Sequence, residues 1–506
     1  MFEREDHSTA ISMLAQDVSF TLSHADIYNQ QGLHWMDMGQ YHEALKYFSL
    51  AIGRGPKIAC LHYNMGLAQK ALGHVQAAGR SFLNALKYDP NYAKAHFSLG
   101  DLLLSARKFD IAEKHFRRAI EINSAYVAAY NHLAHCLGEQ GRLKEAQRLL
   151  IKALQINPES AQTQCNFGNL ARQCHEFDKA IRHYREAIRL QPDFIEAHFN
   201  LSLVLLLLEN FKYGWNEYEW RLRFFPKDSG YPNRFGLPLW RGQSLLGKAI
   251  LVYDEQGFGD VFMACRYLLT LKRLGARLVF ETRPELFDLF TPMSYIDETI
   301  LRTQNRPPSI PCDYCTPLLS LPGIFNLNRQ TIRFEKPYLC SNKKLAAHWS
   351  NKMTSDLVKI GLVWQGSAAD RNRRCGIDKL KALYGLRGIK WYGLQKDLSY
   401  CSKDNTNWIV QLGPGLRNFA DTAAVISNLD LVISIDTSVA HLAGAMGKRV
   451  WVLLPYVPDW RWFLNDTATP WYGSMRLFRQ SKMGDWDSVI QFVRKAIEKE
   501  FCGVEK

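Results

Sequence analysis

The first half of the chain repeats one pattern of small and large apolar residues every 34 positions. Equivalent positions in successive units form columns. Small side chains in three of these columns allow two antiparallel helices to approach closely. A large column fills the space between units, and proline ends the second helix. The pattern predicts five helix pairs over residues 25–194 and a degenerate sixth that keeps Gly214 and Tyr218 in register. The columns are Gly32, Gly66, Gly100, Ala134 and Gly168; Ala44, Ala78, Ala112, Ala146 and Ala180; Phe48, Phe82, Phe116, Leu150 and Tyr184; Ala51, Ala85, Ala119, Ala153 and Ala187; and Pro56, Pro90, Ser124, Pro158 and Pro192.

The second half follows a different pattern, which begins after a Gly- and Pro-rich stretch predicted to be a linker over residues 226–246. Short, continuously apolar runs alternate there with helical segments, and this alternation predicts parallel sheets covered on both faces. A polar, Lys-rich run at 338–356 is predicted to divide two lobes, 247–345 and 356–506. The expected strands are 249–254, 277–282, 357–364, 389–394, 407–411, 430–435, 449–454 and 475–479, with helices notably at 261–273 and 438–446.

The expected fold is therefore an α-solenoid over residues 25–225, preceded by a helical segment at 1–24 and followed by two α/β lobes. Ligands of open parallel sheets bind at the carboxyl ends of the strands, so a cleft between the lobes is the expected ligand site.

Composition is that of a soluble globular protein, with 506 residues of which 47% are hydrophobic and 22% charged. The apolar run 201–208 is too short to span a bilayer, and the acidic N-terminus lacks the pattern of a secretory signal. Eleven scattered cysteines suit a reducing compartment. We expect a cytoplasmic protein without a transmembrane segment.

The net charge of +14 indicates an anionic partner, and its distribution narrows the choice. Residues 1–240 carry 27 basic and 24 acidic side chains, whereas residues 241–506 carry 36 and 25. The excess lies on the half with the predicted sheets, so an anionic small molecule is expected there rather than a nucleic acid.

One candidate site is the turn EQGFGD at residues 255–260, between a predicted strand and a predicted helix. Gly257 and Gly259 allow a sharp turn and a close approach. Asp260 is placed equally well to cap the helix or to act as a catalytic base. The turn has neither the third glycine of a dinucleotide fingerprint nor the GK[ST] of a phosphate loop.

A second candidate is the segment SIDTSVAHLAGA, in which a buried strand ends at Asp436 and a helix begins at once. Thr437, Ser438 and free backbone amides at that helix N-terminus suit a phosphate. His441 lies one turn further on. A lone histidine on such a helix is more often structural, but its position beside a phosphate site favours ligand contact.

Other features carry less weight. Arg371, Arg373 and Arg374 follow a predicted strand and either clamp phosphate or belong to a solvated loop. Thirteen of the fifteen histidines lie in the first half, without metal-ligand spacing, and are expected to be solvated or to line a groove. No metal site is expected.

Both halves resemble known families. The 34-residue pattern resembles tetratricopeptide repeats. The second half resembles the glycosyltransferase module of bacterial proteins that fuse such repeats to a GT-B pair of Rossmann-like lobes, related to the family 9 lipopolysaccharide heptosyltransferases. It is more distantly similar to eukaryotic O-GlcNAc transferases. The matching stretches are EWR at 219–221, EQGFGD at 255–260, CTPLLSLP at 315–322, GLVWQGS at 361–367, LQK at 394–396, the run 419–448, VWVLLPYVPDWRWFL at 450–464 and PWYGSMRLFRQ at 470–480.

The resemblance implies roles for individual residues. Asp260 corresponds to the proposed general base, and Arg374 to a basic residue that reaches the donor phosphates. The resemblance further implies a donor-binding set of Gly366, Gln395, Lys396, Asp436, Thr437, Ser438 and His441, and an acceptor-side set of Glu255, Gln256, Gly257 and Gly259. Two departures from the family pattern are Tyr253, where histidine is common, and a compressed loop at 369–377.

The expected function is a glycosyltransferase of the hexosyl or heptosyl type that moves a sugar from a nucleotide sugar to a protein or peptide held by the repeats. The transfer inverts configuration and needs neither metal nor cofactor. Two alternatives stay open. One is a non-catalytic repeat scaffold whose GT-B module only binds nucleotide or is degenerate. The other is transfer to a lipid-linked glycan.

Overall fold

The computed structural model describes residues 23–224, 235–302, 311–332, 336–366, 374–397 and 406–502. The chain divides into two compact units, Met1–Cys174 and His175–Lys506. The last repeat helices therefore belong to the unit that contains the sheets, a division that the repeat pattern did not predict. The expected helical segment 1–24 lies outside the described residues except for its last two positions, and so do residues 226–234 of the expected linker. The rest of that linker, 235–246, packs on the first sheet, where Leu239 bridges to Cys315 and Trp240 is buried, so it is not a free linker there. No helix in the described ranges combines the length and apolar character needed to cross a membrane.

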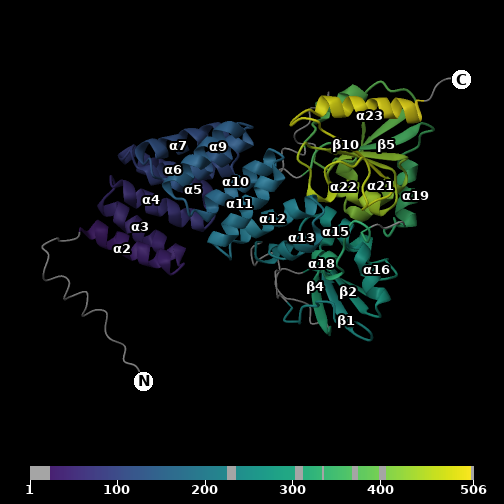
Figure 1. Cartoon of the computed structure of the whole chain (residues 1–506), viewed down its shortest axis with the longest axis horizontal. Helices are drawn as coiled ribbons and strands as arrows, with labels where there is room; N and C mark the ends of the chain where they lie inside the picture. Colours follow the sequence, from purple (N-terminus) through teal and green to yellow (C-terminus); the bar gives the residue numbers. More distant parts are fainter. Residues whose placement is uncertain are drawn as a thin grey trace. The chain divides into compact units, whose positions relative to one another are not determined.

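The repeat region consists of twelve consecutive helices, α2 to α13 (Figure 1). The predicted pairing is confirmed within each unit, where the two helices of a pair contact each other. In most of the first five pairs, proline follows the second helix by two residues, as expected for a helix-ending residue. The first unit contains α2 (His24–Asp37), α3 (Tyr41–Arg54), α4 (Ala59–Ala71), α5 (Val75–Tyr88), α6 (Ala93–Ser105), α7 (Phe109–Ile122), α8 (Val127–Glu139), α9 (Leu143–Ile156) and α10 (Ala161–Gln173). The second unit begins with α11 (Phe177–Leu190), α12 (Ile195–Leu207), the shorter α13 (Phe211–Tyr218) and a single turn, α14 (Arg221–Phe224).

The recurring columns form the interior of the helix pairs. All fifteen side chains in the two alanine columns and the large column are at most 1% exposed. A Cβ on Gly66 would lie 2.5 Å from the Phe82 ring, and a Cβ on Gly100 would lie 2.8 Å from the Phe116 ring. Each ring thus fills space that the glycine leaves within its own pair. Phe116 also packs against the His132 ring of the next pair, with centroids 5.6 Å apart, so the large column fills space between units as expected and within each pair as well.

Several histidines of the repeats have structural partners. The Nε2 atoms of His62, His96 and His198 each donate to the carbonyl of the proline six residues earlier, at 2.8, 3.1 and 3.0 Å. That carbonyl follows the end of a helix, where backbone acceptors lack intrahelical partners. His62 and His198 are buried. The interpretation of the repeat histidines as solvated or groove-lining residues is therefore wrong for His62 and His198, whereas His96 is only half-buried.

The first sheet is parallel, with strand order β3-β2-β1-β4. Predicted strands β1 (Ala249–Tyr253) and β2 (Arg277–Thr282) are confirmed, whereas β3 (Glu298–Leu301) and β4 (Tyr314–Pro317) were not predicted. The single helix expected at 261–273 is two helices, α15 (Phe258–Ala264) and α16 (Arg266–Arg273). Shorter elements follow β2 and β4, namely α17 (Pro284–Phe290), η2 (Leu318–Ser320) and α18 (Leu321–Ile324).

The second sheet is also parallel, with order β10-β9-β8-β5-β6-β7. The chain builds outward from β5 to β7 and then returns to the other side of β5. The order therefore reverses between β5 and β8, and open parallel sheets bind ligands at such a reversal. All six strands were predicted, namely β5 (Val358–Val363), β6 (Ile389–Gly393), β7 (Val410–Gln411), β8 (Leu431–Ile435), β9 (Val450–Leu454) and β10 (Met475–Arg479).

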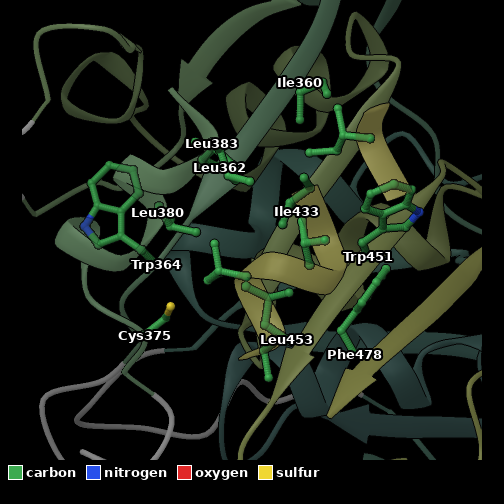
Figure 2. Close-up of a cluster of buried hydrophobic side chains, with 14 of the residues drawn as sticks. Ile360, Leu362, Trp364, Cys375, Leu380, Leu383, Ile433, Trp451, Leu453 and Phe478 are labelled. Atoms are coloured by element: carbon green, nitrogen blue, oxygen red, sulfur yellow. The ribbon is translucent and has the colours of Figure 1, made fainter. Parts of the chain in front are cut away.

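Alternate side chains of the second sheet form an apolar core with α23 (Trp486–Phe501). Ile360, Leu362, Ile433 and Leu453 are at most 1% exposed in this cluster (Figure 2). In Figure 1, α23 lies on one side of the sheet, and α21 (Phe419–Ser427) and α22 (Ser438–Ala445) lie on the other. Helices thus cover both faces, as the continuously apolar strands predicted.

The run 338–356, expected to divide the lobes, contains the helix α19 (Lys343–Lys352). This helix packs on α21. Its buried Trp349 donates to Asp421 at 3.2 Å. Much of the predicted divider is therefore part of the layer that covers the second sheet.

The packing of the repeats predicts a contrast between two adjacent residues. Phe82 is fully buried and Leu83 is 54% exposed. Phe82→Ala should lower the free energy of unfolding of α4 and α5 by about 3–5 kcal/mol, because it removes a ring and leaves a cavity. Leu83→Ala should change it by less than about 0.5 kcal/mol. Hydrogen exchange of these helices in urea measures both, and equal effects would contradict the packing described here.

Candidate functional site

A cavity of about 760 Å³ lies in the second unit, at the carboxyl ends of strands from both sheets. The turn after β1 contributes Gln256 to Asp260, and the end of β8 with the start of α22 contributes Asp436 to His441. Further lining residues come from the ends of β5 and β6, from the segments at α17 and α21 and after β9, and from the repeat helices α12 and α13. The cavity therefore coincides with the point where the order of the second sheet reverses.

Asp260 is both a helix cap and a cavity residue. Its Oδ2 accepts a 2.8 Å hydrogen bond from the backbone N–H of Gly257, which precedes the first residue of α15. Its Oδ1 forms an ion pair with Arg461, from the segment after β9. The side chain is 16% exposed and lines the cavity. The cap is thus confirmed, and the role of base stays a prediction.

The sharp turn before α15 is made by Gln256, not by Gly257. Gln256 has φ +54°, a left-handed conformation that is uncommon for a residue with a side chain, whereas Gly257 has φ −78°. Two contacts hold Gln256 in place. Arg283 donates to its carbonyl at 2.9 Å, and the Tyr218 hydroxyl donates to its Oε1 at 3.2 Å.

Gly259 permits a close approach, as predicted, and the group that approaches is His441. A Cβ on Gly259 would lie 2.8 Å from His441 Cδ2. The helices α15 and α22, from the two sheet regions, pack together around this contact. The glycine is therefore required for the packing of one sheet region on the other.

His441 is held on several sides. Its Nδ1 shares a 2.9 Å hydrogen bond with the Tyr472 hydroxyl, and its ring stacks on Trp462 with centroids 5.0 Å apart. Burial raises the pKa of Tyr472, so this group remains a neutral hydroxyl at pH 7. The Nε2 atom lies 3.6 Å from Oδ1 of Asp436. His441 is thus fixed in orientation and still lines the cavity.

The N-terminus of α22 opens on the same cavity. Thr437 is the N-cap residue, but its hydroxyl bonds to the Ser434 hydroxyl at 2.8 Å and not to the helix backbone. Thr437, Ser438 and Val439 all line the cavity. The first amides of a helix carry partial positive charge, so this end of α22 suits an anionic group.

Some of the other residues predicted to bind the donor line the cavity, and others do not. Gly366, Gln395 and Lys396 line the cavity, and Gln395 Oε1 accepts a 3.1 Å hydrogen bond from the Gln365 backbone N–H. Arg374 is not among the lining residues. Arg371 and Arg373 lie outside the described residues.

Glu255, predicted on the acceptor side, is a buried structural residue. It is 1% exposed, is not among the lining residues, and forms two hydrogen bonds with the fully buried Arg221, at 2.8 and 3.0 Å. Its Oε1 also accepts from the backbone N–H of Leu319 at 2.8 Å. Arg221 donates further to Glu219 and Ser320. This ion pair joins α14 to the first sheet.

Sequence reasoning missed several lining residues. Arg461 and Asp459 follow β9, and Phe199, Leu203 and Tyr218 come from the repeat helices. The first two follow a predicted strand within the matching stretch 450–464, and a strand end was a usable signal. The repeat residues gave no such signal, because only the fold brings α12 and α13 to the cavity.

The described lining is acidic, in contrast to the basic half that contains it. Five carboxylates face two cationic side chains, Lys396 and Arg461. The list of carboxylates is Asp260, Glu285, Asp397, Asp436 and Asp459. The excess positive charge of residues 241–506 is therefore not concentrated in this part of the site.

Comparison with known proteins concerns mainly the helices. Residues 63–127 and 126–193 each match a family model described as tetratricopeptide repeat. These helices are tetratricopeptide repeats. Repeats of this kind form elongated surfaces suited to binding other proteins.

Individual relatives are distant. The chain is similar to Protein FlbA from Caulobacter vibrioides, with 26% identity in an alignment of 392 residues that covers 66% of this chain and 65% of FlbA. Among solved structures, a MamA fragment from Desulfovibrio magneticus RS-1 is 22% identical with a TM-score of 0.32, covering 34% of this chain and 98% of that one. The repeat protein YrrB is 22% identical with a TM-score of 0.30, covering 38% and 96%.

The buried ion pair predicts a structural, not a functional, defect on substitution. Glu255→Ala should lower the free energy of unfolding by about 3–5 kcal/mol, because it leaves the Arg221 guanidinium buried without its partner. The exposed pair Arg277–Glu298, 2.7 Å apart, is the control, and Glu298→Ala should cost less than about 1 kcal/mol. Urea unfolding measures both variants. Glu255→Gln, which keeps the shape of the side chain, provides an intermediate case. Similar stability of the Glu255 and Glu298 variants would contradict the structural role.

Proposed function

We propose that this protein is a glycosyltransferase that moves a sugar from a nucleotide sugar to a protein or peptide acceptor. One observation carries the proposal. A single cavity brings together Asp260, from the turn after β1, and the N-terminus of α22, at the reversal point of the second sheet. A carboxylate facing a phosphate-binding helix end is an arrangement suited to acid–base chemistry beside an anionic leaving group.

The second sheet supplies the donor site in this proposal. Its strand order is that of doubly wound, Rossmann-like sheets, which bind nucleotides at the reversal point. The diphosphate would lie on the amides that begin α22, near Thr437 and Ser438, and Gln395 and Lys396 would contact the nucleoside side. A GT-B pair of lobes is the architecture that this assignment implies.

The reaction is a displacement at the anomeric carbon of the sugar. The acceptor oxygen forms a bond to that carbon, and the bond from the carbon to the phosphate oxygen breaks with its electron pair leaving on the nucleoside diphosphate. Asp260 takes the acceptor proton, and attack from the opposite face inverts configuration. The amides of α22 stabilise the charge on the leaving group, so the proposal needs no metal.

The repeats supply the acceptor in this proposal. Phe199 and Leu203 of α12, with Tyr218 of α13, form part of the cavity wall, so a polypeptide lying on these helices has access to Asp260. Burial raises the pKa of Tyr218, which keeps its hydroxyl neutral beside the turn. These contacts favour a protein acceptor over a lipid-linked glycan.

A non-catalytic scaffold is the second candidate, and the acidic lining favours it. In the described lining, five carboxylates against two cations oppose the binding of a diphosphate. In this alternative the repeats bind a partner and the sheets bind nucleotide weakly or not at all.

A panel of nucleotides separates the two candidates. The unfolding temperature should rise in the presence of one of UDP, GDP, ADP, CMP or their sugars. A ligand at 100 times its dissociation constant stabilises the folded state by about 2.7 kcal/mol. The matching nucleoside serves as the control for the phosphates. The absence of any shift across the panel would favour the scaffold.

A second test addresses the base. Asp260→Asn should abolish sugar transfer while nucleotide binding persists, because the amide cannot accept the acceptor proton. Asp421 offers a matched control, since it occupies the same third position of its helix, pairs with Arg417 at 2.8 Å and does not line the cavity. Asp421→Asn should retain transfer. Near-normal turnover by the Asp260 variant would show that another group is the base.

A further inference from the structure

The ion pair between Arg461 and Asp260 joins the two sheet regions inside the cavity. Asp260 belongs to the first turn of α15, and Arg461 belongs to the short helix η6 (Trp460–Trp462) after β9. Both residues line the cavity. One oxygen of Asp260 is bound by the Gly257 N–H, and the other faces the guanidinium. A hydroxyl that gives its proton to Asp260 therefore arrives at a carboxylate that already has two donors.

Arg461 is held by several contacts, but not all of its N–H donors have a hydrogen-bond partner. Its Nη1 donates to Asp459 at 2.6 Å, its Nη2 faces Asp260, and the guanidinium stacks over the Trp460 ring at 4.3 Å. The residue is only 7% exposed, and its Nε has no hydrogen-bond partner among the described residues. A buried donor without a partner costs free energy, which an anionic ligand in the cavity could recover.

The chemistry of the guanidinium points to phosphate. Arginine presents a planar fork of N–H donors that matches phosphate oxygens in pairs, and such bonds are among the stronger ones in proteins. Of the two cations in the described lining, Lys396 has its Nζ 3.5 Å from the carbonyl of Arg417. Arg461 is therefore the cation in that lining that is both buried and in contact with the proposed base.

We propose that Arg461 couples donor binding to the release of Asp260. The donor phosphate and the Asp260 carboxylate compete for the same guanidinium. When phosphate binds, Arg461 turns toward it and Oδ1 of Asp260 becomes available to the acceptor hydroxyl. Without donor, Arg461 keeps Asp260 occupied. Arg461 is thus a positioning residue for Asp260, and this inference rests on the proposed function.

The coupling sets an order of events. Donor binds first, because the acceptor hydroxyl finds Asp260 free only in the donor complex. Linkage also requires the reverse effect: if phosphate weakens the ion pair, the ion pair weakens phosphate binding by the same factor. Removal of the Asp260 charge should therefore make the cavity a better phosphate site. The loss of a carboxylate from an acidic cavity also favours an anion by itself. The coupling is therefore read from the double variant, because a gain that arises from charge alone persists when Arg461 is replaced.

Calorimetric titration tests this with UDP, GDP and ADP and with uridine, guanosine and adenosine as phosphate-free probes. For the diphosphate that binds the wild type, Asp260→Asn should tighten binding about threefold to tenfold, a usual range for coupled neighbours. Arg461→Lys should weaken it about tenfold. In the double variant, Asp260→Asn should give no further gain. Nucleoside affinity should stay unchanged in every variant.

Two control variants exclude general effects. Asp421→Asn removes a carboxylate at the same third position of a helix, and Arg277→Lys alters an exposed cation of the first sheet that pairs with Glu298 and lies outside the cavity lining. Neither should change diphosphate affinity. Circular dichroism at the titration temperature confirms that each variant is folded.

The outcomes are distinguishable. If the wild type binds a diphosphate and Asp260→Asn leaves its affinity equal or lower, the coupling is wrong while the proposed function survives. If Arg461→Lys has no effect, Arg461 does not contact phosphate and the coupling is equally wrong. If the wild type binds no diphosphate at all, the proposed function and this inference both fail.

Discussion

The buried ion pair between Arg221 and Glu255 is the interaction on which the site depends. Two charges removed from water are tolerated only when their attraction and their remaining hydrogen bonds offset the cost of desolvation. Here those bonds come from α14, the strand end after β1 and the backbone at Leu319. The pair can therefore form only when these elements are all in place. The turn that bears Gln256 and Asp260 follows Glu255 directly, so the geometry of the cavity depends on the same set of contacts.

Much of the fold was predictable because it depends on local patterns. The 34-residue columns predicted the helix pairs, and continuous apolar runs predicted all six strands of the second sheet. The strands β3 and β4 were missed for a physical reason. Glu298–Leu301 has exposed ends and half-buried centre residues, and Tyr314–Pro317 ends in proline, so neither shows a continuous apolar run. The regular parts of the chain carry their own signals, and the short edge strands do not.

The candidate site was predictable only in part. Asp260 and the start of α22 were found because each follows a strand at a chemically informative turn. The role of Glu255 was misjudged, because its partner lies 34 residues away on another element. Arg461 is 201 residues from Asp260, and no spacing in the sequence links them. The net charge of residues 241–506 predicted a basic ligand site, but the described lining is acidic. A total over 266 residues does not describe the few side chains around one cavity.

The fit between glycine and phenylalanine in the repeats has a consequence for how these helices can vary. Three pairs combine Gly with Phe, while the fourth combines Ala134 with Leu150, both at most 3% exposed. A larger residue in one column goes with a smaller residue in the other. What is held constant is the combined volume at each crossing of two helices, not the identity of either side chain. Substitutions in these two columns are therefore tolerated in compensating pairs, and a change in one column alone leaves either a void or a clash.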